Sequence, residues 1–243
     1  MPADYDPKPI EEFAAVIPEK LEGRSGKLFY AGRAAFGIAL PIYILALNPG
    51  GYDEDHLDEK IGQHTERVLH QPERDWSALF DEVWRPRRTC YPKGEAPMQR
   101  RVRHLLEELG LDPRRVPMSN IIFVRSPRQA KLSRQDAETA ALVRPFHLRV
   151  IDKLRIRMVL CLGQRATDYV QRQLDEREFV DAWKEKYENR SWRCEAWRSS
   201  STGRLIVRLT HPSVADWTNP AADPSDFVRR LLDQVSSGTA GPT

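Results

Sequence analysis

Apolar runs of strand length recur along the chain, with helical patterns between them. The runs lie at residues 39–47, 121–124, 158–162 and 205–210. Continuous apolar runs of this length are typical of strands that are buried on both faces. Segments with apolar residues at helical spacing lie at residues 102–109, 133–154, 166–174 and 227–235. Because strands alternate with helices, the pattern predicts an α/β fold whose mainly parallel sheet is covered by helices on both faces.

The length and the pattern predict one domain. A chain of 243 residues is long enough for a single α/β domain with a full core. We expect residues 28–235 to form this domain, residues 1–27 to form an N-terminal arm, and residues 236–243 to form a flexible tail. Residues 52–104 are highly charged and predict an insertion that is helical in pieces. Residues 183–198, rich in Trp and charge, predict an extra pair of strands.

The first and the last apolar runs end abruptly in polar residues. The first run is followed by Asn48, Pro49 and Gly50, and the last by His211 and Pro212. A proline stops a strand, and a glycine lets the backbone come close to a ligand. The carboxyl ends of parallel strands share one edge of a sheet, and ligands of open α/β sheets bind there. We therefore expect Asn48 and His211 to lie at one site.

These segments resemble motifs of the uracil-DNA glycosylase superfamily. Asn48-Pro49-Gly50 is similar to the water-positioning motif of its mismatch-specific and single-strand-selective branches. His211-Pro212-Ser213 is similar to its His-Pro-Ser loop. Residues 116–123 resemble the strand whose Asn reads the flipped base, and residues 157–166 resemble the strand, Leu-Gly turn and helix that follow. The four motifs occur in the family's order between about residues 40 and 233.

The resemblance implies a fold, an activity and a partner. The fold is a three-layer α/β/α sandwich around a central, mainly parallel, four-stranded sheet. The activity is that of a monofunctional DNA N-glycosylase that hydrolyses the bond to a flipped uracil or another deaminated or mismatched pyrimidine, leaving an abasic site. The partner is DNA, and neither a metal nor another cofactor is implied. Since no lysine lies in either motif, the sequence offers no obvious nucleophile for lyase chemistry.

Asn48 and His211 are the candidate catalytic residues under this resemblance. The amide oxygen of Asn48 can accept a hydrogen bond from a water but is a poor general base, so we expect it to position the water. His211 is expected to donate to O2 of the departing pyrimidine. Each residue has a plainer interpretation, in which Asn48 begins a turn before Pro49 and His211 is a loop histidine with its own partners.

The remaining base-binding candidates are Asn120, Gly50 and Phe123. Asn120 can pair with the Watson–Crick edge of a base, but its amide matches uracil in one orientation and cytosine in the other; a structural network is the alternative. Gly50 stands where the strictly uracil-specific branch has a Tyr that blocks C5, so it predicts space beside C5 unless another side chain fills it. Candidates for the aromatic ring that stacks on the base are Trp76, Phe80, Trp84 and Phe123.

Charge and cysteine content narrow the picture further. The formal net charge is only +3, but arginines cluster near residues 85–103 and 125–134. We expect DNA contacts from the residues Arg88, Arg101, Arg125, Arg128, Pro212 and Ser213. A solvated surface is the alternative for each arginine. The three cysteines are scattered and predict no metal or iron–sulfur site. The N-terminus is acidic and has no apolar segment, so we expect a cytoplasmic protein that does not bind a membrane. We also expect a monomer with no obligate protein partner.

Three other functions stay open. The open side at Gly50 also suits a base modified at C5, such as glucosylated 5-hydroxymethylcytosine in phage DNA, which would make the protein an antiviral defence enzyme. A non-catalytic DNA-binding relative would keep the basic loops without turnover. A nucleotide-binding enzyme using the turn at Leu162-Gly163-Gln164 is disfavoured, because the chain has neither a G-x-G-x-x-G motif nor a phosphate loop ending in Lys-Ser/Thr.

Overall fold

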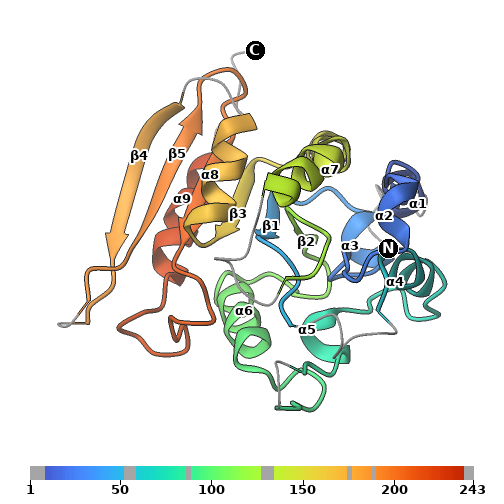
Figure 1. The fold of residues 1–243 in the computed structure, drawn as a ribbon. Coiled ribbons are helices and arrows are strands. Elements are labelled where there is room, and N and C mark those ends of the chain that lie inside the picture. The colour runs from blue at the N-terminus through green and yellow to red at the C-terminus, as the bar shows by residue number, and fades with distance from the viewer. Residues whose placement is uncertain are drawn as a thin grey trace.

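A six-stranded mixed sheet forms the centre of the protein in the computed structural model, which describes residues 9–51, 59–85, 89–126, 134–173, 177–187 and 190–237 (Figure 1). The strands lie in the order β2-β1-β3-β6-β5-β4. Their bounds are β1 (Ile42–Ala46), β2 (Met118–Asn120), β3 (Met158–Leu162), β4 (Arg177–Lys184), β5 (Arg193–Ser199) and β6 (Leu205–Leu209). The α/β class predicted from the sequence is confirmed.

The sheet has a parallel part and an antiparallel part. Strands β2, β1, β3 and β6 are parallel neighbours, and β1 and β3 are buried along their whole length. Strand β5 pairs antiparallel with β6, and β4 pairs antiparallel with β5. The four-stranded sheet was therefore a wrong expectation, because the hairpin of β4 and β5 extends it. The extra strand pair expected at residues 183–198 is confirmed, although it begins earlier, at Arg177.

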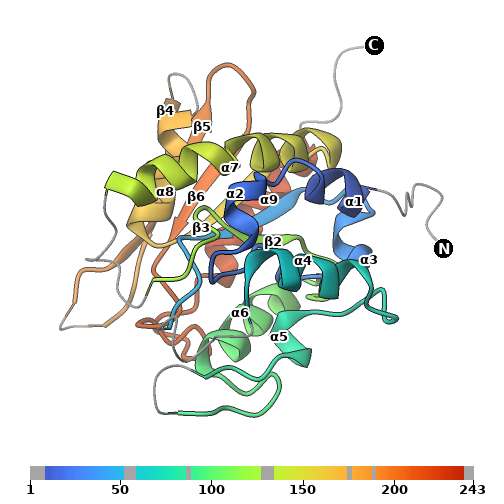
Figure 2. The same ribbon diagram turned by 45° about the vertical axis from the view of Figure 1, so that its right-hand side comes forward.

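Helices cover both faces of the sheet. Their bounds are α1 (Pro9–Ala14), α2 (Glu19–Glu22), α3 (Arg33–Phe36), α4 (Ile61–Leu69), α5 (Ala78–Asp81), α6 (Pro97–Glu108), α7 (Arg134–Lys153), α8 (Gln164–Gln173) and α9 (Ser225–Ser237). Across the sheet, the connection from β1 leads to β2 on one side, whereas the connections from β2 to β3 and from β3 to β6 lead towards the other side. Right-handed crossovers therefore place α6 and α7 on opposite faces. Helix α8 packs on β3 and β6 on the side of α7, and α9 contacts α6 (Figures 1 and 2).

The second parallel strand ends earlier than the sequence predicted. It comprises Met118–Asn120, whereas residues 121–124 were the expected strand. Beyond Asn120 the chain still donates from Ile121 to the carbonyl of Ala46, but Val124 turns away and forms a bridge with Gly26. The pairing of Val124 with Gly26 thus ends the pairing between β1 and β2. As a result, Asn120 stands at the carboxyl end of its strand, level with the end of β1.

The described part of the expected N-terminal arm belongs to the core. Ile10 and Phe13 are buried, and the ring of Phe13 packs edge-on against Phe146 of α7. The chain then passes along the free edge of β2, where Tyr30 donates its backbone N–H to the carbonyl of Met118. This segment therefore adds an outer neighbour to the parallel part of the sheet.

The expected insertion contains short helices rather than long ones. Within the expected insertion, α4 begins at Ile61 and comprises nine residues, and α5 comprises four. The flexible tail expected from residue 236 does not begin there, because α9 continues to Ser237. Residue 133, where the long helix was expected to begin, and residues 238–243 lie outside the described residues. No helix in the described part of the chain is both long and apolar enough to cross a bilayer.

Candidate active site

A cleft of about 1230 Å³ opens at the carboxyl edge of the parallel strands. The turn after β1, the end of β2, the turn after β3 and the loop after β6 all line it, as do parts of the N-terminal segment and of the insertion. It brings together six of the residues predicted from the sequence, namely Asn48, Gly50, Asn120, Arg125, His211 and Ser213. Parallel strands deliver these residues to one edge, as expected.

The turn after β1 fixes the orientation of the Asn48 amide. Its Nδ2 donates to the carbonyl of Pro49 at 2.9 Å and to that of Ser126 at 3.1 Å. A carbonyl can only accept, so both N–H groups of the amide are used within the protein. Asn48 is part of the cleft wall, and its Oδ1 is therefore the atom it offers to a bound molecule. The site has an acceptor here and no strong base.

The loop after β6 fixes the tautomer of His211. The backbone N–H of Ser213 donates to Nδ1 at 3.1 Å, and the Ser213 hydroxyl lies 2.8 Å from the same nitrogen. Because Nδ1 accepts a proton donor, the proton of the neutral ring is on Nε2. Burial lowers the pKa of His211 to about 4, so the ring is neutral at pH 7. His211 therefore offers the cleft a neutral N–H donor.

Arg101 holds this loop in place, and Gly163 lies beside the His211 ring. Arg101 donates from Nη1 to the carbonyl of Pro212 at 2.7 Å and from Nε to Asp216 at 3.0 Å. Gly163, at the end of β3, has a φ of 92°, and a Cβ there would meet the His211 ring at 3.6 Å. The predicted phosphate contact at Arg101 is thus an internal brace, and Pro212 lies in the braced loop rather than in the cleft wall.

Asn120 offers the cleft an acceptor. Its Nδ2 donates to the hydroxyl of Tyr30 at 2.8 Å and lies 3.5 Å from the backbone carbonyl of Lys27. Its Oδ1 is buried without a hydrogen-bond partner among the described residues. A buried acceptor without a partner costs free energy unless a bound molecule satisfies it.

Gly50 leaves open space at the cleft. A Cβ built there would meet no heavy atom of the described residues within 4 Å. Its φ lies outside the left-handed region, unlike that of Gly51 at 98°. A Cβ at position 50 therefore meets neither a steric obstacle among the described residues nor backbone strain.

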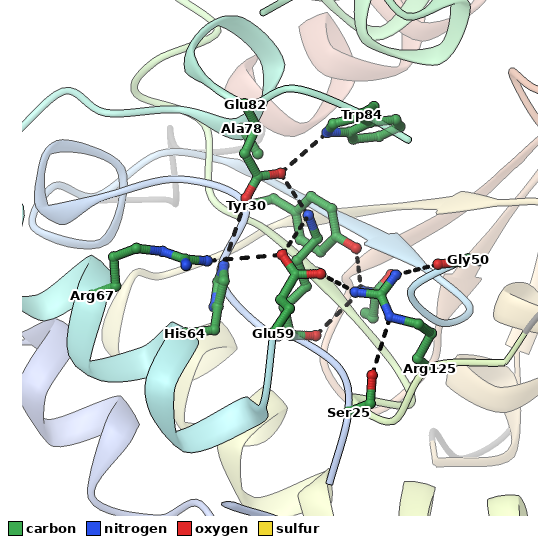
Figure 3. A network of polar contacts seen from close by, with 12 residues as sticks. Ser25, Tyr30, Gly50, Glu59, His64, Arg67, Ala78, Glu82, Trp84 and Arg125 are labelled. Carbon is green, nitrogen blue, oxygen red and sulfur yellow. Dashed lines mark hydrogen bonds and ion pairs between the residues drawn. The ribbon is translucent and has the colours of Figure 1, made fainter. Parts of the chain in front are cut away.

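Arg125 and Phe123 have structural roles that the sequence did not predict. The Arg125 side chain is buried and donates to the carbonyl of Gly50, to the carboxylate of Glu59 and to Ser25 (Figure 3). It braces the turn after β1 and is not a surface contact for phosphate. Phe123 is fully buried in an aromatic cluster with Phe146 and lies outside the cleft wall. The other two predicted contacts, Arg88 and Arg128, lie outside the described residues.

The sequence did not point to a buried ion-pair network around Glu59 and Glu82 (Figure 3). Lys27 donates from Nζ to Glu82 at 2.5 Å and lies 3.7 Å from Glu59. Glu82 also accepts from the indole N–H of Trp84 at 3.1 Å. Burial alone lowers the pKa of Lys27, but Glu82, Tyr30 and Glu59 raise it further than burial lowers it. Lys27 is therefore an ammonium ion in the wall of the cleft.

The same network contains the one cluster of metal-ligand side chains found among the described residues. Donor atoms of Glu59, His64 and Glu82 lie within 4.8 Å of one another. However, the ammonium of Lys27 and the guanidinium of Arg125 already neutralise the two carboxylates. A metal ion would have to displace these cations, so the donor set fits an ion-pair network better than a metal site.

Aromatic and apolar side chains at the cleft differ from those expected. Of the predicted stacking candidates, Trp84 lines the cleft, while Trp76 is buried and Phe80 packs against the guanidinium of Arg114. In the loop after His211, Trp217 is fully buried. Only Val214 of that loop is an exposed large apolar residue, with 54% of its surface accessible.

The chain was compared with known protein families and with curated proteins. No protein-family model and no curated protein matches it.

Proposed function

We propose that the protein is a DNA glycosylase that hydrolyses the N-glycosidic bond of a flipped pyrimidine. One observation carries this proposal: a fixed acceptor on Asn48 and a fixed neutral donor on His211 line the same cleft. The proposal also takes the four parallel strands and their helices as an α/β/α core of the uracil-DNA glycosylase type. The hairpin of β4 and β5 is an addition to that core.

The two side chains suit the two ends of the bond that breaks. The bond between the sugar and the base breaks through a transition state with positive charge on the sugar, and the base departs with negative charge. Oδ1 of Asn48 holds a water against the anomeric carbon, which is a positioning role. Nε2–H of His211 donates to O2 of the leaving base. A preorganised donor of this kind contributes roughly 3–4 kcal/mol to catalysis.

The state of Lys27 favours hydrolysis over lyase chemistry at this amine. A Schiff base requires a neutral amine, whereas Lys27 is held as an ammonium ion by Glu82 and Glu59. The product is therefore an abasic site whose strand stays intact until alkali is added.

Two further side chains suit the handling of flipped DNA. Val214, two residues from Pro212, is exposed and apolar and suits a wedge that fills the gap left by the base. Trp84 suits the ring on which the base stacks, because Glu82 fixes its indole edge. Trp84 is one of the four stacking candidates expected from the sequence.

A second candidate substrate is favoured by Gly50. The open space at its Cβ position and the large cleft leave room for a substituent at C5 of the pyrimidine. A base modified at C5, including a glucosylated one in phage DNA, is therefore a substrate of the same site under this alternative. That substrate would make the protein a defence enzyme instead of a repair enzyme.

A panel of oligonucleotides tests the proposal. Each strand carries one defined base, in single-stranded and duplex form, and abasic sites are detected by alkali cleavage. The double variant Asn48→Ala/His211→Ala, purified identically, controls for contaminating glycosylases. We expect cleavage at one or a few modified or deaminated pyrimidines with the wild type only. Salt-sensitive DNA binding without any abasic site would instead identify a non-catalytic DNA-binding protein.

A further inference from the structure

Lys27 and Asn120 stand side by side at the far end of the cleft from His211. The segment containing Lys27 and Tyr30 runs along the free edge of β2, and Asn120 ends β2. Strands β1 and β3 follow in the sheet, and β6, which leads to His211, comes next. Along the edge of the sheet, Asn120 therefore lies between Lys27 and His211.

The two residues offer opposite hydrogen-bonding groups. Asn120 offers the cleft only its acceptor, Oδ1, because its Nδ2 already donates to the Tyr30 hydroxyl. The backbone carbonyl of Lys27, which can only accept, lies near the same Nδ2 and supports this orientation of the amide. The ammonium of Lys27 can only donate. It has three N–H groups; Nζ donates to Glu82, and Glu59 and the rings of Tyr30 and Trp84 also lie near it.

The order of these groups matches one kind of pyrimidine. Read along its edge from O2, a uracil ring presents an acceptor at O2, a donor at N3–H and an acceptor at O4. The cleft presents a donor on His211, an acceptor on Asn120 and a donor on Lys27, in the same order. A cytosine ring presents an acceptor at N3 and a donor at N4, which would face Asn120 and Lys27 with like groups.

We propose that Lys27 is a specificity-determining residue that selects a 4-keto pyrimidine, a ring of the uracil type, by donating to O4 while Asn120 accepts from N3–H. This inference rests on the proposed glycosylase function and names its substrate class. With the open space at Gly50, the preferred bases are uracil and C5-substituted uracils. Modified cytosines fit the same space but face Lys27 with an amino group.

The ion-pair network keeps Lys27 in this state. The two carboxylates that hold it are themselves held, Glu82 by Trp84 and Glu59 by Arg125 (Figure 3). Gln99 of α6 further fixes the chain by donating to the backbone carbonyl of Glu82 at 2.9 Å. Glu82 is therefore a positioning residue for both the ammonium and the indole.

A matched pair of substrates tests the inference on the wild-type protein. Two oligonucleotides of the same sequence carry either 5-hydroxymethyluracil or 5-hydroxymethylcytosine, which share the C5 substituent and differ at position 4. We expect base release from the uracil-type strand to be faster by roughly a hundredfold or more, because a buried site rejects a base that leaves its polar groups unpaired. Equal or faster release from the cytosine-type strand overturns the inference and leaves the glycosylase function intact. If no base is released from any strand of the wider panel, the proposed function itself fails.

A variant pair assigns the preference to Lys27. Lys27→Met alone would bury the Glu82 carboxylate without its partner, so it is combined with Glu82→Gln, and Glu82→Gln alone serves as the control. In the double variant we expect the preference for the uracil-type strand to fall at least about tenfold, mainly through slower release of that base. The single variant already lacks the Glu82 charge that positions the ammonium, so it is the reference background, and the preference is compared between the two variants. An unchanged preference in the double variant, with a thermal unfolding midpoint near that of the control, overturns the role of Lys27.

Discussion

Removing the donor of His211 is the sharpest test of the catalytic geometry. In His211→Ala the single Nε2–H donor to the leaving base disappears. One preorganised donor of this kind contributes roughly 3–4 kcal/mol, and each 1.4 kcal/mol is about a factor of ten in rate. We therefore expect base release to slow by a factor of roughly one hundred to one thousand. The fold should persist, because His211 lies in a loop that Arg101 and Trp217 also anchor.

Ser213→Ala is the matched control for that variant. It removes the hydroxyl 2.8 Å from Nδ1 but keeps the backbone N–H that fixes the tautomer. We expect it to slow base release less than about tenfold, since Nε2 still carries the ring proton. The assay is single-turnover base release, with enzyme in excess and alkali cleavage of the product. If His211→Ala stays near the wild-type rate, or Ser213→Ala falls as far as His211→Ala, the proposed role of the imidazole is wrong.

Further expectations follow from the same site and from the core. Asn48→Ala should slow release by roughly a hundredfold or more and lower stability by about 1–3 kcal/mol, because it removes the water acceptor and two hydrogen bonds that hold the turn after β1; chemical denaturation and kinetics together check both effects. Gly50→Tyr should exclude C5-substituted bases while keeping activity on uracil, and Gly50→Ala should leave both activities and stability unchanged; loss of all activity in both variants would contradict the open-pocket argument. Asn120→Asp should abolish release or change the base released, and an identical substrate profile would assign Asn120 a purely structural role. Burial lowers the pKa of His147 to about 3 from its ordinary 6.5, so on acidification the unfolded chain protonates this histidine before the folded chain does. The free energy of unfolding should therefore fall by up to roughly 4 kcal/mol as pH drops from about 6.5 towards 3. Urea unfolding at each pH checks this, and His147→Gln should flatten the plot of stability against pH.

The sequence predicted the parts of the fold that depend on local pattern. Apolar runs identified β1, β3 and β6, and the rule that parallel strands share a carboxyl edge placed Asn48 and His211 at one cleft. The exact end of β2 could not be predicted, because it depends on the bridge between Gly26 and Val124, which are far apart in the chain. Another long-range contact, that of Phe13 with Phe146, placed the N-terminal segment in the core.

Side-chain roles were predicted less well, for a physical reason. An arginine in a basic stretch looks the same whether it faces a phosphate or an internal carboxylate. Arg101 and Arg125 turned out to have partners within the protein. Lys27 was missed because its partner Glu82 lies in the insertion, and nothing in the local sequence of either residue indicates the pair. A lone Lys next to Gly and Leu reads as a surface residue until the fold buries it.

The most direct test of the central claim is a stoichiometric measurement on one substrate. An oligonucleotide carrying 5-hydroxymethyluracil is incubated with the wild-type protein, the free base is quantified by mass spectrometry, and alkali-labile sites are counted in the same sample. We predict that free base and alkali-labile sites appear in equal amounts and that the strand stays intact before alkali. If the protein binds DNA but releases no free base and forms no alkali-labile site on this or any other strand of the panel, the glycosylase account is contradicted. Strand cleavage before alkali would contradict simple hydrolysis.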